Sequence, residues 1–191
     1  MAALLQLSVS LVLVMLFTVN CSDFDTCGRV NLGQNQFAVG GDEPPNFAPW
    51  VVALGIRKDQ DKDDYEEFVV QCTGSILTNT FIVSAAHCFD QEFASYNYNV
   101  DDLVARVGAT KIDSVRHVEI EIESYVKHPK FEDPKIYYDI ALAKLAKPVT
   151  FNRRIQAICL PLEPVGNENI VTVQGWGNGD GELTQINVGA R

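Results

Sequence analysis

The chain has 191 residues, of which 47% are hydrophobic, and its formal net charge is −10. This length and composition are sufficient for about one to one and a half globular domains with a sizeable core. Because an acidic protein repels phosphate backbones, nucleic acid is excluded as an expected partner.

The first 22 residues contain no Asp, Glu, Lys or Arg and are dominated by apolar side chains. Small residues follow at Cys21 and Ser22, and an acidic stretch begins at Asp23. This pattern is typical of a secretory signal peptide, predicted over residues 1–22 with cleavage near Cys21 or Ser22. A signal anchor is the alternative, but an anchor usually carries flanking positive charge. We therefore expect a secreted, extracellular protein with no membrane segment after cleavage.

Four cysteines remain after such a cleavage: Cys27, Cys72, Cys88 and Cys159. The oxidising compartment to which secretion leads favours disulfides over free thiols. Cys72 and Cys88 bracket two short strand-like runs, so their spacing predicts a disulfide that closes a hairpin.

Short strand-type runs follow one another along the chain, and no long segment has a helical period. The predicted strands are residues 50–56, 68–72, 75–77, 81–84, 102–107 and 117–123. The last run alternates strictly between apolar and acidic residues, which predicts one buried face and one wet acidic face. Many short strands at close spacing indicate an all-β barrel or sandwich. The highly charged segment 57–67 is interpreted as a solvated hairpin tip, with a recognition loop for a basic partner as the alternative.

A histidine stands at the end of one apolar run, in Ser84-Ala85-Ala86-His87-Cys88. An imidazole fixed beside a crosslink, at the end of a buried strand, has what a positioned general base requires. A core histidine next to a structural cysteine is the alternative interpretation. A metal site formed by His87, Cys72 and Cys88 is a further alternative, but the spacing matches no zinc pattern and the compartment is oxidising. We expect no bound metal.

An aspartate opens a later apolar run, Asp139-Ile140-Ala141-Leu142. A carboxylate drawn toward the interior is costly unless it is hydrogen-bonded or paired. A histidine ring N–H is a natural partner, and the carboxylate would then fix the tautomer of the ring. An aspartate that caps a turn is the alternative.

Several motifs, in this order along the chain, resemble those of the chymotrypsin/trypsin-like serine endopeptidases. They are Val39-Gly40-Gly41 with Pro49-Trp50, Cys72-Thr73-Gly74-Ser75, Ser84-Ala85-Ala86-His87-Cys88, Asp139-Ile140-Ala141-Leu142, Ile158-Cys159-Leu160-Pro161 and Gly175-Trp176-Gly177. The resemblance extends from about Cys27 to the last residue. It implies a trypsin-like double antiparallel β-barrel, with the active site in the cleft between the barrels.

The resemblance also assigns roles to individual residues. It implies that His87 is the general base and that Asp139 orients it, as in the serine–histidine–aspartate mechanism. It implies a disulfide between Cys72 and Cys88, and another between Cys27 and Cys159 that ties an activation leader to the body. The implied activity is proteolysis without a cofactor, on protein or peptide substrates, with protease inhibitors as further partners.

The third catalytic residue of this family stands in Gly-Asp-Ser-Gly-Gly, downstream of Gly-Trp-Gly. None of the serines after the signal region has that glycine frame; they are Ser75, Ser84, Ser95, Ser114 and Ser124. We therefore expect a complete first barrel over about 50–149 and a truncated second barrel, with strands at 170–176 and 183–188. Without a nucleophile and an oxyanion hole the chain as given is expected to be an inactive fragment of a peptidase. A non-catalytic protease homologue with a binding or regulatory role is the alternative.

Residues 23–37 are predicted to form the leader, and residues 38–191 the C-terminally incomplete peptidase domain. The family usually cuts after a basic residue and before Ile-Val-Gly-Gly, whereas here Phe37 precedes Ala38-Val39-Gly40-Gly41. This departure favours the non-catalytic alternative. Some relatives bind calcium in the loop that corresponds to 108–118, but Asp113 is its only acid, so no calcium site is expected.

Overall fold

The computed structural model describes residues 27–28, 48–59, 66–90, 102–112, 116–132, 135, 137–164, 166, 169–176 and 183–189. The predicted signal peptide, most of the predicted leader, the Val39-Gly40-Gly41 motif and Asp113 lie outside the described residues. The elements are β1 (Val51–Asp59), β2 (Glu66–Ile76), β3 (Phe81–Ser84), the 3₁₀ turn η2 (Ala86–Phe89), β4 (Val104–Val107), β5 (Val118–Lys127), β6 (Ala141–Leu145), β7 (Ile170–Gly175) and β8 (Thr184–Gly189). Within this part of the chain, no helix has the length and apolar character needed to cross a membrane.

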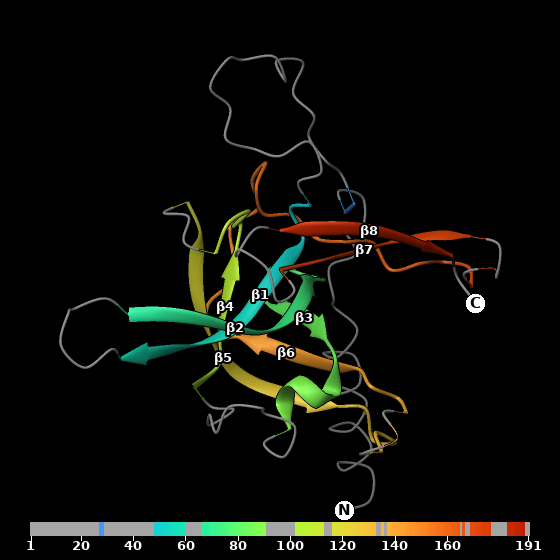
Figure 1. Cartoon of the computed structure of the whole chain (residues 1–191), viewed down its shortest axis with the longest axis horizontal. Helices are drawn as coiled ribbons and strands as arrows, with labels where there is room; N and C mark the ends of the chain where they lie inside the picture. The colour runs from blue at the N-terminus through green and yellow to red at the C-terminus, as the bar shows by residue number, and fades with distance from the viewer. Residues whose placement is uncertain are drawn as a thin grey trace, which may run out of the picture.

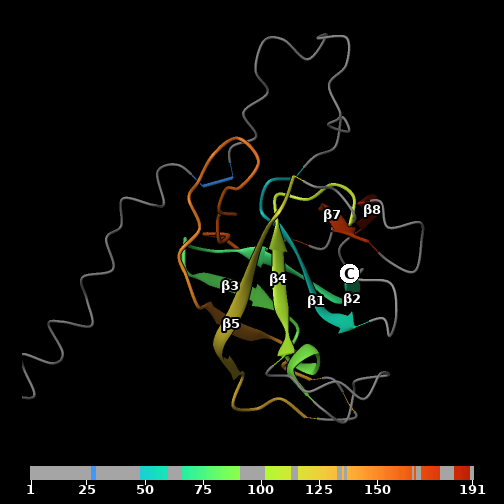
Figure 2. The same ribbon diagram turned by 90° about the vertical axis from the view of Figure 1, so that its left-hand side faces the viewer.

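Strands β1 to β6 form a closed antiparallel barrel in the order β1-β2-β3-β6-β5-β4. Figures 1 and 2 show the barrel from two directions. The barrel closes where β1 pairs with β4, with Val52 opposite Val107. Inward-facing apolar side chains of alternate positions fill the interior. Those with almost no exposed surface include Val52, Leu54, Ile76, Ile82, Leu103 and Leu145. The predicted all-β class with a complete first barrel is confirmed.

Strand β6 lies between β3 and β5, although it follows both in the sequence. Its register places Ala141 opposite Ser84 at the end of β3. His87 follows Ser84 by three residues and Asp139 precedes Ala141 by two, so both emerge at the same rim of the barrel. The strand order therefore brings the two predicted catalytic residues together.

Strand β2 is one continuous strand, and the prediction of two separate strands at 68–72 and 75–77 was wrong. Thr73 and Gly74, which separated the two predicted strands, pair with Ala53 and Val52 of β1. A side-chain carbon at Gly74 would lie 2.9 Å from the carbonyl oxygen of Val83 on β3. The glycine thus permits a close approach of two strands and does not mark a turn.

Strand β5 departs from the simple alternation that its sequence predicted. Val118 is 47% exposed, whereas Glu119 on the expected wet face is largely covered. Glu119 is covered because it pairs with two arginines: its Oε1 lies 3.1 Å from Nη2 of Arg106, and its Oε2 lies 3.1 Å from Nε of Arg57. The Arg106 guanidinium also lies 3.9 Å from the ring centroid of Phe68. Glu119 is therefore the partner of a buried cation. Its pairing with Arg106 explains why it is covered, although the alternation of the sequence predicted that it would be exposed.

Replacement of Glu119 with Ala is expected to lower the free energy of unfolding by about 3 kcal/mol, because it leaves the buried Arg106 without its carboxylate. Glu123→Ala on the same strand is the matched control. Glu123 pairs with Lys144 at 2.7 Å, but both side chains are more than 40% exposed, so its loss should cost less than about 1 kcal/mol. Denaturant unfolding of the two variants measures the difference. Equal losses would contradict the structural role of Glu119.

Strands β7 and β8 form a separate two-stranded antiparallel sheet that lies beside the barrel (Figure 1). Trp176, directly after β7, is only 2% exposed and belongs to a buried cluster that contains Phe68 of the barrel. The amide of Leu183 donates a hydrogen bond of 2.8 Å to the carbonyl of Thr110. These contacts attach the sheet to the barrel. The two strands correspond to those predicted at 170–176 and 183–188, the beginning of a second unit.

Candidate active site

His87 is held by a short turn whose other side chains point into the core. It lies in η2, directly after β3, where Ala86, Cys88 and Phe89 are all at most 3% exposed. The His87 side chain is 38% exposed. The three buried residues fix the backbone of His87, so the imidazole extends to the surface from a rigid turn.

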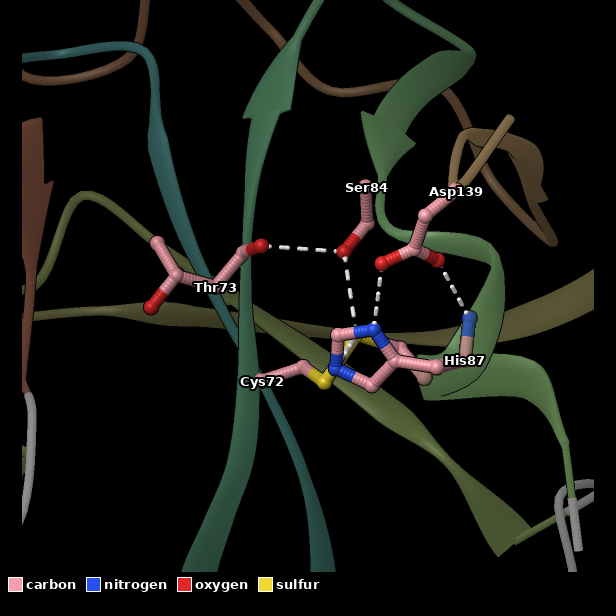
Figure 3. Close-up of a disulfide and its surroundings, with 6 residues drawn as sticks. Cys72, Thr73, Ser84, His87 and Asp139 are labelled. Atoms are coloured by element: carbon pink, nitrogen blue, oxygen red, sulfur yellow. Dashed lines mark hydrogen bonds and ion pairs between the residues drawn. A yellow bond between two sulfur atoms is a disulfide. The ribbon is translucent and has the colours of Figure 1, made fainter. Parts of the chain in front are cut away.

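The disulfide between Cys72 and Cys88 ties this turn to β2, and the sulfurs lie 2.06 Å apart (Figure 3). It closes the β2–β3 hairpin in the manner that the spacing of the two cysteines predicted. The hydroxyl of Ser84 adds a second tie, since it donates to the carbonyl of Thr73 at 2.9 Å. Ser84 is 9% exposed and engaged in this bond, so it acts as a structural serine.

Asp139 contacts His87 twice, as Figure 3 shows. Its Oδ2 lies 2.7 Å from the ring Nδ1, and its Oδ1 accepts a hydrogen bond of 2.8 Å from the backbone N–H of His87. Two contacts to one residue fix both the position of the carboxylate and the plane of the imidazole. The sequence-predicted pair is therefore brought together, although the two residues are far apart in the chain.

The environment of Asp139 favours its ionised form. Burial alone would raise its pKa, but hydrogen bonds from the His87 side chain and backbone, the charge of His87 and the amide of Ala86 together lower the pKa below the ordinary value. A carboxylate at Nδ1 holds the imidazole proton on that nitrogen. The lone pair then resides on Nε2, which lies 3.7 Å from the Cys88 sulfur. This arrangement can accept a proton at Nε2 and stabilise the resulting imidazolium.

Asp139→Asn is expected to make folding less sensitive to acid. The lowered pKa in the folded state means that the unfolded chain, with an aspartate pKa of about 3.9, binds the proton more readily. The carboxylate therefore stabilises the fold above about pH 4, and this contribution is lost as the pH falls through the folded-state pKa. Unfolding free energies measured between about pH 5 and about pH 2 should fall less steeply in Asp139→Asn than in the wild type. Identical slopes would contradict the lowered pKa.

The side chains of Cys72, His87 and Cys88 bring three potential metal-ligand atoms within 4.8 Å of one another. Metal binding by cysteine requires the thiolate. Both sulfurs are used by the disulfide, so the oxidised protein presents only the imidazole here. The absence of a bound metal stays a prediction.

The second disulfide joins Cys27 to Cys159, 132 positions later. The adjacent Gly28 donates its amide to the carbonyl of Ala157 at 2.7 Å and has a φ of 66°. A side-chain carbon at Gly28 would lie 3.0 Å from the Cys159 sulfur, so the close approach and the positive φ both require glycine. These contacts fasten the segment around Cys27 to the loop after the barrel.

Two residues around this site were missed by sequence reasoning: Tyr138, next to Asp139, and His128. Tyr138 has a φ of 56°, and its ring is stacked on that of His128. No local sequence pattern predicts a positive φ at a tyrosine, because glycine, asparagine and aspartate are the residues that usually adopt it. The stacking partner belongs to another segment, so the sequence carried no signal for the pair.

Comparison with known proteins shows what this chain is similar to. The family model described as Trypsin matches residues 38–191. The venom peptide isomerase heavy chain of Agelenopsis aperta is 32% identical over 139 residues, which cover 73% of this chain and 54% of that protein. The clotting factor G beta subunit of Tachypleus tridentatus is 31% identical over 178 residues, with coverages of 85% and 54%. Chymotrypsin-C of Rattus norvegicus is 32% identical over 142 residues, with coverages of 73% and 49%. The chain thus spans about half the length of these curated relatives.

Proposed function

This chain belongs to the trypsin-like serine protease family, and from that membership we propose that it supplies the general base and the orienting carboxylate of a secreted serine endopeptidase. One observation carries the proposal: the carboxylate of Asp139 contacts both the Nδ1 and the backbone N–H of His87, at 2.7 and 2.8 Å. A merely structural ion pair would not require both contacts. A general base needs both, because its tautomer and its direction must be fixed together.

In the proposed reaction, His87 removes a proton from a serine hydroxyl through Nε2 as the serine oxygen attacks the carbonyl carbon of the scissile peptide bond. The tetrahedral intermediate collapses when His87 returns the proton to the leaving amine, and water then hydrolyses the acyl-enzyme by the same route. Asp139 remains ionised and stabilises the imidazolium formed in each step. The proposal requires a serine in a Gly-Asp-Ser-Gly-Gly frame, which the 191 residues do not contain.

The domain organisation belongs to the same proposal. Residues 1–22 direct secretion and are removed, residues 23–37 form a leader, and residues 38–191 form the peptidase part. The bond between Cys27 and Cys159 supports a leader that stays attached after cleavage, since a disulfide retains a segment whose peptide link is cut. Similarity to a relative named as a venom serine protease supports secretion.

A non-catalytic homologue is the second candidate, and one observation favours it. Phe37 occupies the position where the family usually has a basic residue, and Ala38 replaces the usual isoleucine. A trypsin-like activator would not cut after Phe37. In this case the barrel would serve as a binding module for a protein partner, and the geometry at His87 would be retained without turnover.

The test that separates the two is to sequence the native transcript past the codon for Arg191 and to express the full product. A frame that continues into Gly-Asp-Ser-Gly-Gly supports the peptidase, and an activated sample should then react with a fluorophosphonate probe for serine nucleophiles. Labelling should disappear in His87→Ala and persist in His117→Ala, since His117 lies beside Glu119 and away from the catalytic pair. A stop codon after Arg191, or another residue in place of the serine, would defeat the peptidase proposal and leave the binding role.

A further inference from the structure

Asp139 lies between two residues that are both in contact with His128. On one side, the Tyr138 ring stacks on the His128 ring with centroids 4.8 Å apart and planes inclined by 7°. On the other side, the carbonyl of Ile140 accepts a hydrogen bond of 2.9 Å from the backbone N–H of His128. A single residue outside the catalytic pair therefore contacts the chain immediately before and immediately after Asp139.

The backbone around Asp139 is tightly turned. The amide of Ile140 donates to the carbonyl of Tyr138 at 2.8 Å, so three consecutive residues form a turn with Asp139 at its centre. Tyr138 has a φ of 56°, in the left-handed region. The direction in which Asp139 leaves the backbone depends on this torsion angle, since a change at Tyr138 rotates everything that follows it.

A tyrosine in this conformation is strained, because its Cβ approaches a carbonyl oxygen too closely. Such strain persists only where the surroundings enforce it, and it concentrates at functional sites. Burial does not enforce it here, since Tyr138 is 53% exposed. Among the described residues, its ring contacts His128 on one side, and the Lys130 ammonium lies 5.7 Å from the ring centroid.

His128 is itself well fixed and can act as a support. Its Nδ1 accepts a hydrogen bond of 3.1 Å from the amide of Lys130, and its carbonyl accepts one of 2.9 Å from the amide of Phe131. Together with the bond to Ile140, these contacts hold both the ring and the backbone of His128. The ring thus offers a rigid surface against which Tyr138 can stack.

We propose that Tyr138 and His128 are positioning residues: their stacked rings hold the strained turn at Tyr138 and thereby aim the Asp139 carboxylate at Nδ1 and the backbone N–H of His87. Neither residue takes part in proton transfer. The inference rests on the proposed function where it assigns these residues a part in catalysis. The effect of the two rings on the contact between Asp139 and His87 can be tested without any enzymatic activity.

The test compares variants of the full 191-residue chain, with both disulfides formed, by NMR. A proton shared between imidazole Nδ1 and a carboxylate is strongly deshielded, so its signal reports the contact between His87 and Asp139. Tyr138→Val should abolish this signal and raise the pKa of Asp139 toward the ordinary value, because a β-branched residue tolerates positive φ poorly. Tyr138→Phe keeps the ring and should leave both readouts unchanged.

Two further variants separate the ring from the backbone. Tyr138→Gly accepts the positive φ but loses the stack, and His128→Ala loses the stack from the other side while keeping its backbone bond to Ile140. Each should broaden the deshielded signal and raise the pKa of Asp139 by less than Tyr138→Val does. The double variant should do no more than either single one, since both remove the same contact.

Tyr137→Val is the matched control, since Tyr137 is an adjacent tyrosine and is 61% exposed. It should leave both readouts at their wild-type values. A wild-type signal and Asp139 pKa in Tyr138→Val or in His128→Ala would overturn the inference. If Tyr138→Val fails to fold, as judged by the resonances of the barrel core, His128→Ala decides. Lack of proteolysis by the full protein would defeat the proposed function but not this result.

Discussion

Asp139→Asn in the proposed full-length peptidase should lower kcat by about 10⁴-fold with little change in KM. The structure gives a specific reason for a loss of this size. The backbone N–H of His87 requires an acceptor at the Oδ1 position, so the amide oxygen of the asparagine must occupy it. The amide NH₂ then faces Nδ1 and turns that nitrogen into an acceptor. The ring proton is forced to Nε2, and the imidazole loses the lone pair with which it would take the serine proton.

Asp90→Asn is the matched control for this experiment. Asp90 follows His87 by three residues and pairs with Lys127 at 2.8 Å, so the variant removes a nearby negative charge without touching the imidazole. Its kcat should remain within about threefold of the wild type, since a partly exposed ion pair contributes little. A loss of less than about tenfold in Asp139→Asn, or equal losses in the two variants, would show that Asp139 does not set the tautomer.

Removal of the bond between Cys27 and Cys159, by replacing both cysteines with Ala, should lower the free energy of unfolding by about 5 kcal/mol. The two cysteines are 132 positions apart, so the crosslink restricts a very long loop of the unfolded chain. The bond between Cys72 and Cys88 spans only 16 positions, and its removal should cost about 3 kcal/mol.

Denaturant unfolding of the two double variants under identical conditions measures both losses. A smaller loss for the Cys27 and Cys159 variant than for the Cys72 and Cys88 variant would contradict the entropic account. It would indicate that packing of Cys88, which is 3% exposed, outweighs loop length. A glutathione titration of the wild type would independently compare how readily the two disulfides are reduced, since the bond at Cys159 lies at an exposed position.

The parts of the fold that sequence reasoning predicted are those with a local cause. Apolar runs bounded by turn residues marked the strands, and His87 and Asp139 stood in short distinctive motifs. The pattern also located the hairpin that the bond between Cys72 and Cys88 closes. Each of these features depends on neighbours in the chain, or on a resemblance between motifs, and can therefore be predicted from the sequence alone.

The parts that sequence reasoning missed depend on contacts between distant segments. Glu119 is covered because Arg106 and Arg57 come from other strands, so the alternation of β5 misplaced it. Gly74 suggested a break in the strand when only the sequence was considered. It lies within β2 because glycine leaves room for the close approach of β3. Tyr138 is strained because His128 stacks on it. Local propensity yields to tertiary contacts in all three cases.

The insertion of β6 between β3 and β5 has a consequence for the order of events during folding. His87 and Asp139 are separated by 52 positions, whereas the β4–β5 and β2–β3 pairs join segments that are neighbours in the chain. Non-local pairings form late, because the entropy of closing a long loop must be overcome first. We therefore expect His87 and Asp139 to meet only when the barrel is nearly complete. Until then the chain has no assembled proton acceptor, so the proposed activity would appear only after the barrel has closed.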